Sequence, residues 1–256
     1  MNLLSPLTLV SICMQHEIFI PQTEWVSASL VTNQTPRSAD TVLQLGCIDG
    51  RAVTFVPRTV RELITSTVEP DGNLPVRVER QLKQSEERRK AAKVIYKNQR
   101  ADDLKETEDN SVDIVISLQA VEAMKENGLD WKKSVREAAR VLKPGGRFIW
   151  VEPTEIDGQN FVDYLGSLVD MTGIEGDGST NIEASDEEDD EDEESNPNGP
   201  IPVFDDGGFD AVDFVLQPHI AGVAFKSIDA GLTPEQRAQK GKVEEEDKMA
   251  EISLQA

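Results

Sequence analysis

The chain has few of the residues that build metal centres or disulfide frameworks. Its 256 residues include two cysteines, Cys13 and Cys47, and two histidines, His16 and His219. Structural zinc sites need four Cys or His ligands at short spacings, and disulfide-rich domains need several cysteine pairs. Neither pattern is present, so we expect no metal site and a protein of a reducing compartment.

Long apolar runs and a basic leader are also missing. The apolar residues 3–13 are few, are interrupted by Pro6, and follow no basic segment. They predict neither a membrane span nor a secretory signal. Arg37 is the one basic residue among the first 40, and plastid transit segments are usually rich in arginine. We therefore expect a cytoplasmic protein, with a plastid location as the weaker alternative.

Basic residues are scarce relative to acids. The sequence has 26 Lys and Arg against 48 Asp and Glu, which gives a net charge of −22. Residues 186–194 are all acidic, and together with Glu183 they supply ten of these carboxylates, so the rest still carries −12. A surface of this sign repels phosphate backbones. The composition therefore disfavours nucleic acid as a partner and favours a small-molecule substrate. It carries no signal for an oligomeric state.

Segments with strand-like and helix-like patterns alternate from residue 41 onward. Such alternation predicts a parallel α/β sheet with helices on both faces. Pro57 lies inside one helical pattern, where we expect a kink or a late start. The expected strands are 42–45, 64–68, 94–96, 112–116, 148–151, 209–216 and 220–225, with the last two paired. The expected helices are 51–65, 76–93, 131–142 and 156–172.

Composition suggests three parts. Residues 1–40 form a poorly defined extension, 41–228 form the folded domain, and 229–256 form a charged tail. Within the domain, residues 175–200 are mostly Gly, Ser, Asn and acids. They have too little apolar surface to offset the entropy of ordering, so they predict a disordered acidic insert.

The most informative stretch is 41–50, which reads TVLQLGCIDG. A short apolar run ends at Gly46, and Gly50 follows four residues later. This pattern predicts a buried strand, a tight turn and a helix, with backbone N–H groups facing a crevice suited to a nucleotide-like ligand. A nicotinamide dehydrogenase would need a Gly-x-Gly-x-x-Gly turn, but positions 48 and 51 hold Ile and Arg.

Several blocks of the sequence, in order, resemble the class I S-adenosylmethionine-dependent methyltransferases, most closely the type 11 group. The blocks that carry the resemblance are the strand and turn 42–50, the acid Glu69, the strand 109–117, the helix end and strand 140–153, and 218–226. They cover about half of the chain. The resemblance implies a Rossmann-like, mostly parallel seven-stranded sheet with helices on both faces and an antiparallel last strand.

The resemblance also implies a cofactor, S-adenosyl-L-methionine, and the residues that bind it. The turn would approach the methionine and ribose parts, and Glu69 would accept hydrogen bonds from the ribose hydroxyls. Ala101 and Asp102 would reach the adenine, and Ser117 would lie beside the sulfonium. The predicted cofactor-binding residues are Gly46, Cys47, Ile48, Asp49, Gly50, Glu69, Ala101, Asp102 and Ser117. No catalytic base is predicted, because methyl transfer depends mainly on alignment.

Four positions depart from the family pattern. Gln44 replaces an acid, Ile48 replaces a glycine, Arg100 replaces an acid, and Pro57 interrupts the following helix. A β-branched side chain at position 48 crowds a turn that favours none. The alternative hypothesis is therefore a catalytically inactive, methyltransferase-like module for binding or assembly.

Some single residues have two interpretations. Cys47 is either a reactive thiol at a helix start or a small buried residue, and we favour the second. His219 is either a general base or a structural histidine, and the structural role is favoured. Glu152 either touches substrate or is solvated at the strand end. Asp113 is expected to bond a neighbouring loop, and Trp150 is expected in the core.

Overall fold

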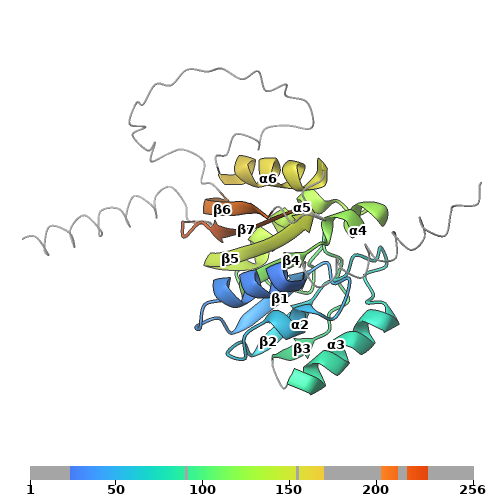
Figure 1. Ribbon diagram of the computed structural model, residues 1–256. Helices are drawn as coiled ribbons and strands as arrows, with labels where there is room; N and C mark the ends of the chain where they lie inside the picture. Colours follow the sequence, from blue (N-terminus) through green and yellow to red (C-terminus); the bar gives the residue numbers. More distant parts are fainter. Residues whose placement is uncertain (1–23, 90–91, 154–155, 170–202, 213–217, 230–256) are drawn as a thin grey trace, which may run out of the picture.

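The computed structural model describes residues 24–89, 92–153, 156–169, 203–212 and 218–229 (Figure 1). The predicted disordered insert 175–200, the first 23 residues of the extension and all but the first residue of the charged tail lie outside these segments. In the described part of the chain, no helix has the length and apolar content needed to cross a bilayer.

Seven described strands form one sheet in the order β3-β2-β1-β4-β5-β7-β6. All neighbours are parallel except β7, which runs antiparallel to β5 and β6. This confirms the expected mostly parallel sheet with an antiparallel last strand. A dinucleotide-binding sheet has the order 3-2-1-4-5-6, without such an inserted strand. The strands are β1 (Thr41–Leu45), β2 (Glu62–Thr65), β3 (Lys93–Ile95), β4 (Val112–Leu118), β5 (Leu142–Pro153), β6 (Phe204–Val212) and β7 (His219–Lys226).

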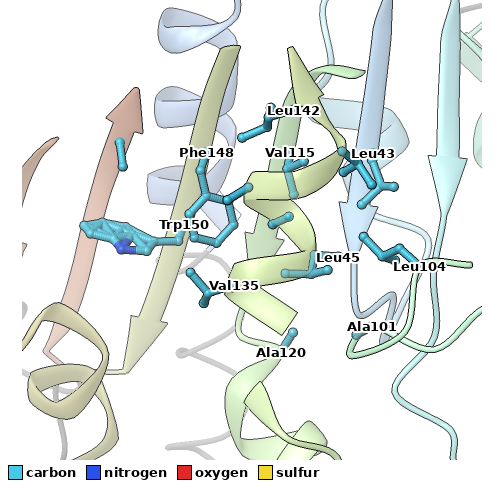
Figure 2. Packing of buried hydrophobic residues seen from close by; sticks show 14 of the residues in the cluster. Leu43, Leu45, Ala101, Leu104, Val115, Ala120, Val135, Leu142, Phe148 and Trp150 are labelled. Carbon is cyan, nitrogen blue, oxygen red and sulfur yellow. The ribbon is translucent and has the colours of Figure 1, made fainter. Parts of the chain in front are cut away.

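Helices cover both faces of the sheet, as predicted (Figure 1). One face packs against the helix over 24–34, α2 (Ala52–Phe55) and α3 (Val76–Arg89). The other packs against α4 (Val121–Glu126), α5 (Trp131–Val141) and α6 (Ile156–Val169). Alternate residues of β1 serve the two cores: Leu43 and Leu45 join the second, and Val42 joins the first. Figure 2 shows Leu43 and Leu45 of β1 and Phe148 of β5 on the side of the sheet that α5 covers.

The predicted helix over 51–65 is wrong beyond its first turn. Helix α2 ends at Phe55, and Val56 is already extended, with φ −65° and ψ 130°. The ring of Pro57 disfavours the helical conformation in the residue before it. Strand β2 then begins at Glu62, two residues earlier than expected, and ends at Thr65.

Two helices were not predicted. Residues 24–34 are helical, which corrects the view of 1–40 as poorly defined throughout. Val31 of this helix is fully buried and Val26 nearly so, so the helix is part of the core. Helix α4 has six residues, too few for an amphipathic period to show in the sequence.

A buried lysine joins β7 to the end of α5. The ammonium of Lys226, which is 7% exposed, donates to the carbonyl oxygens of Arg140 (3.3 Å) and Leu142 (2.6 Å) and to Oδ1 of Asn110 (2.8 Å). Carbonyls at a helix C-terminus lack partners within the helix, and a cation there is favourable. Burial nevertheless lowers the pKa of Lys226.

Replacing Lys226 by methionine is expected to lower the free energy of unfolding by about 2–3 kcal/mol, because the buried Leu142 carbonyl and the partly buried acceptors of Arg140 and Asn110 each lose a hydrogen bond to a cation. Urea denaturation followed by circular dichroism measures the loss. The matched control is Lys83→Met, since Lys83 forms an exposed ion pair with Glu79 that contributes little. Equal effects of the two substitutions would contradict a special role for Lys226.

Candidate functional site

The chain reverses its direction of strand addition between β1 and β4. These strands pair side by side, with Leu45 opposite Ser117, while β2 and β5 lie on their outer sides. In open α/β sheets, ligands bind in the crevice at the carboxyl ends of such a pair. The segments after the two strands are the Gly46–Gly50 turn and Gln119, so both border this crevice.

The turn after β1 requires glycine at its first position. Gly46 has φ +64°, and a Cβ there would lie 2.8 Å from Cε of Met124. Its N–H donates to Oγ of Ser66 (3.0 Å), and the N–H of Cys47 donates to the Ser66 carbonyl (2.7 Å). Within the described segments, the N–H groups of residues 48–50 have no acceptor, so they remain available to a ligand.

Gly50 has a packing role. A Cβ at this position would lie 2.6 Å from the carbonyl carbon of Gln81 and 2.7 Å from the nitrogen of Leu82. The backbone of α3 therefore rests directly against the turn, and any side chain would push the two apart.

Ile48 packs against the core beside the turn. Its half-buried side chain packs against the apolar cluster that contains Leu45, Val68, Ala101 and Met124. This cluster lies on the face toward Ala101, where the predicted nucleoside would also lie. A glycine at position 48 would lack these apolar contacts.

An ion-pair network closes the pocket at the switch point. Arg51 contacts Asp49 at 2.6 Å and Glu24 at 3.2 Å, which ties the helix over 24–34 to the turn. Burial opposes the charge of Arg51, but its bonds to the two carboxylates outweigh this and raise its pKa. A cavity of about 10 Å³ lies beside this network, and its lining residues are Glu24, Ser27, Asp49, Arg51, Phe55, Leu118 and Gln119.

Glu69 lies beside the loop that contains Ala101. The N–H of Ala101 donates to the carbonyl of Thr67 (2.9 Å), and the Glu69 N–H donates to the Thr67 hydroxyl (3.1 Å). Glu69 is four residues beyond the end of β2, so it is on a loop and not in the strand. Glu69 and Ala101 thus both bond Thr67, and their role toward a cofactor stays a prediction.

Asp102 is held within its own loop. Its carboxylate accepts two hydrogen bonds from Arg100, at 2.8 and 2.6 Å. Burial would raise the pKa of Asp102, but the Arg100 guanidinium and the Asp130 N–H outweigh it and lower the pKa. The carboxylate is thus anionic and already hydrogen-bonded.

Ser117 and Glu152 form a buried pair behind the switch point. The Ser117 hydroxyl donates to Oε1 of Glu152 (3.3 Å), which also accepts the Ala120 N–H (3.1 Å). Glu152 is 2% exposed, so the expectation that it is solvated at the strand end is wrong. The Glu152 carboxylate joins the end of β4 to the start of α4. The hydrogen bonds from the Ser117 hydroxyl and the Ala120 N–H offset the cost of burying it.

Gln119, which the sequence analysis did not select, borders the same crevice. It has φ +55°, a conformation that non-glycine residues seldom adopt, and its N–H donates to the Val151 carbonyl (2.8 Å). Its Nε2 lies 3.3 Å from Nε2 of His219, which is 1% exposed. The sequence held one signal for Gln119: it directly follows the buried strand β4, and ligands bind at the carboxyl ends of such strands.

Three structural interpretations from the sequence are confirmed. Cys47 is buried, its thiol donates to the Asp49 carbonyl (3.0 Å), and burial followed by the Asp49 charge raises its pKa, which opposes a thiolate. Asp113 accepts the N–H groups of Asp40 (3.0 Å) and Thr41 (2.9 Å). Trp150 lies in the core, 4% exposed.

A comparison with protein-family models finds a match for the central part of the chain. The family model described as a methyltransferase domain matches residues 43–150, which confirms the resemblance to the type 11 group. This segment runs from β1 through β5 and contains every predicted cofactor-binding residue. No curated protein sequence matches the chain.

The chain is similar to several solved structures, which match it over different shares of their length. YcgJ from Bacillus subtilis is 25% identical over 56% of this chain and 58% of its own, with a TM-score of 0.42. The 16S rRNA N2 G1207 methyltransferase of T. thermophilus is 12% identical, with coverages of 78% and 38% and a TM-score of 0.44. A possible histamine N-methyltransferase from Thermotoga maritima is 12% identical, with coverages of 85% and 97% and a TM-score of 0.47. The chain thus spans little more than half of the first and less than half of the second.

Proposed function

We propose that this methyltransferase domain binds S-adenosyl-L-methionine and transfers its methyl group to a small-molecule acceptor. The observation that supports this most is the gathering of four separate segments at one edge of the sheet. The Gly46–Gly50 turn, Glu69, the Ala101–Asp102 loop and the end of β4 all border the β1–β4 crevice or its flank.

The residues present fit the parts of this cofactor. The N–H groups of residues 48–50 would face its methionine part and sugar, and the carboxylate of Glu69 would accept both ribose hydroxyls. Arg51 would pair with the carboxylate of the amino acid end, and Asp49 and Glu24 with its ammonium. When bound, the cofactor supplies a methyl group that is already activated. The chain's own residues then need only hold the acceptor in line and exclude water.

The charge of the chain supports a small acceptor. A net charge of −22 disfavours approach to a nucleic acid backbone. In the pocket itself, the two carboxylates of Glu24 and Asp49 outnumber the single guanidinium of Arg51. We infer that anionic acceptors are disfavoured.

A second function is favoured by Ile48 and the closed pocket. Space of about 10 Å³ holds a water molecule, whereas cofactor pockets measure hundreds of Å³. Gln44, which stands where the family has an acid, is buried, and no residue in the described part of the chain donates a hydrogen bond to its Oε1. These features support a methyltransferase-like module that binds another molecule without catalysis.

Isothermal titration with S-adenosylhomocysteine, the demethylated product, tests the proposal. We expect saturable one-to-one binding of S-adenosylhomocysteine. ADP, which carries the same nucleoside, is the control and is expected not to bind. Absence of heat at millimolar ligand favours the inactive module. Ile48→Gly then separates the causes: if this variant binds and the natural chain does not, the isoleucine is what closes the site.

A further inference from the structure

We propose that Gln119 binds the methyl acceptor through its side-chain oxygen and that His219 is a positioning residue that orients this amide. The inference rests on the proposed function and names the acceptor group: an uncharged amine or a hydroxyl, which has the lone pair that takes the methyl group and also presents an N–H or O–H. Three observations support it: His219 is buried, Gln119 has a left-handed backbone, and Gln119 lines the pocket.

Gln119 is held rigidly where the crevice begins. It lines the switch-point pocket together with Asp49 and Leu118. Its left-handed backbone is fixed on one side by the bond to the Val151 carbonyl and on the other by the bond between the Ala120 N–H and Glu152. Left-handed non-glycine residues cost free energy and persist where the surroundings enforce them, often at functional sites.

The contact with His219 determines which end of the amide faces the pocket. The two nitrogens are 3.3 Å apart, and Nε2 of an amide can only donate. In this arrangement the amide donates and Nε2 of His219 accepts, which the tautomer with its proton on Nδ1 allows. Gln119 lines the pocket, and with its nitrogen committed to His219 the amide keeps Oε1 for another donor, since no described residue donates to that oxygen.

An amide oxygen at this place selects the chemistry of the acceptor. A carboxamide oxygen accepts hydrogen bonds and donates none, so a bound group must bring the hydrogen. Amines and hydroxyls do so, whereas a thioether or a carboxylate does not. The excess of carboxylates over guanidinium in the pocket lining also opposes an anion.

Sinefungin provides a probe that needs no identified acceptor. This cofactor analogue carries an amine-bearing carbon in place of the sulfonium, so its amine occupies the position of the methyl group and points at the acceptor site. We expect the natural chain to bind sinefungin more tightly than S-adenosylhomocysteine. Gln119→Ala is expected to reduce that preference about tenfold while leaving the affinity for S-adenosylhomocysteine unchanged.

The matched control is Gln159→Ala. Gln159 is an exposed residue of α6 whose amide donates to Asp163 at 2.8 Å, away from the crevice. We expect this variant to keep both affinities. A Gln119→Ala variant with an unchanged preference, or with both affinities lowered equally, would overturn the inference.

His219 is tested by loss and rescue. His219→Ala frees the amide to rotate and is expected to reduce the sinefungin preference about threefold. His219→Gln retains a side-chain acceptor and is expected to restore it. Unchanged binding of S-adenosylhomocysteine shows that each variant is folded. If the natural chain does not bind S-adenosylhomocysteine, the proposed function fails and this inference with it. If the chain does bind it but Gln119→Ala leaves the preference for sinefungin unchanged, only this inference fails.

Discussion

Gly222→Ala is expected to lower the free energy of unfolding by about 3 kcal/mol, because the tertiary structure leaves no room for one methyl group. Gly222 in β7 lies opposite Trp150 in β5. An added Cβ would be 1.7 Å from Cη2 of Trp150 and 2.5 Å from the Gly208 carbonyl oxygen. The indole extends from β5 across β7 (Figure 2) and packs against Phe161, with the two ring centroids 5.8 Å apart, so it would have to move to admit the methyl group.

Gly208→Ala in the adjacent strand β6 is the matched control. A Cβ at this position would meet no atom within 4 Å, so we expect a change within about 0.5 kcal/mol. Thermal and urea unfolding of both variants measure the difference. The double variant Gly222→Ala with Trp150→Leu should recover part of the loss, since the smaller side chain makes room and the two changes are coupled. Additive losses would show that the clash is not with the indole.

Glu69→Gln is expected to weaken the binding of S-adenosylhomocysteine about 30-fold under the proposed function. Two hydrogen bonds from the ribose hydroxyls to a carboxylate are charge-assisted, and an amide offers one acceptor and one mismatched donor. The side chain of Glu69 is half-buried, and in the described segments no residue donates to its carboxylate. The substitution should therefore leave the stability of the fold unchanged.

Isothermal titration of the variant, with unfolding curves beside it, separates binding from folding. Glu79→Gln is the control, because it makes the same change to a glutamate in the first turn of α3. Glu79 forms an exposed ion pair with Lys83 and is not a predicted cofactor residue. If Glu69→Gln binds as tightly as the natural chain, the sugar is not held at this carboxylate and its prediction as a cofactor residue is wrong.

The architecture was largely predictable because it depends on local patterns. Apolar residues in short runs, such as Val42–Leu45 and Val112–Ile116, predict buried strands, and the apolar spacing of 131–142 predicts a helix. Their alternation predicts a parallel sheet with helices on both faces. The glycine at position 46 was also predictable, since a strand that ends in a sharp turn requires a positive φ there.

The sequence by itself determined the strands, the turn after β1 and the kind of protein, because each of these depends on residues close together along the chain. Only the tertiary structure decided which distant side chains meet. Gln119 and His219 are 100 residues apart, and Lys226 reaches carbonyls 84 and 86 residues away. The buried carboxylate of Glu152 meets Ser117 of the neighbouring strand β4 and the N–H of Ala120 at the start of α4. Such contacts follow from the order of strands in the sheet and from close packing, which no local pattern specifies.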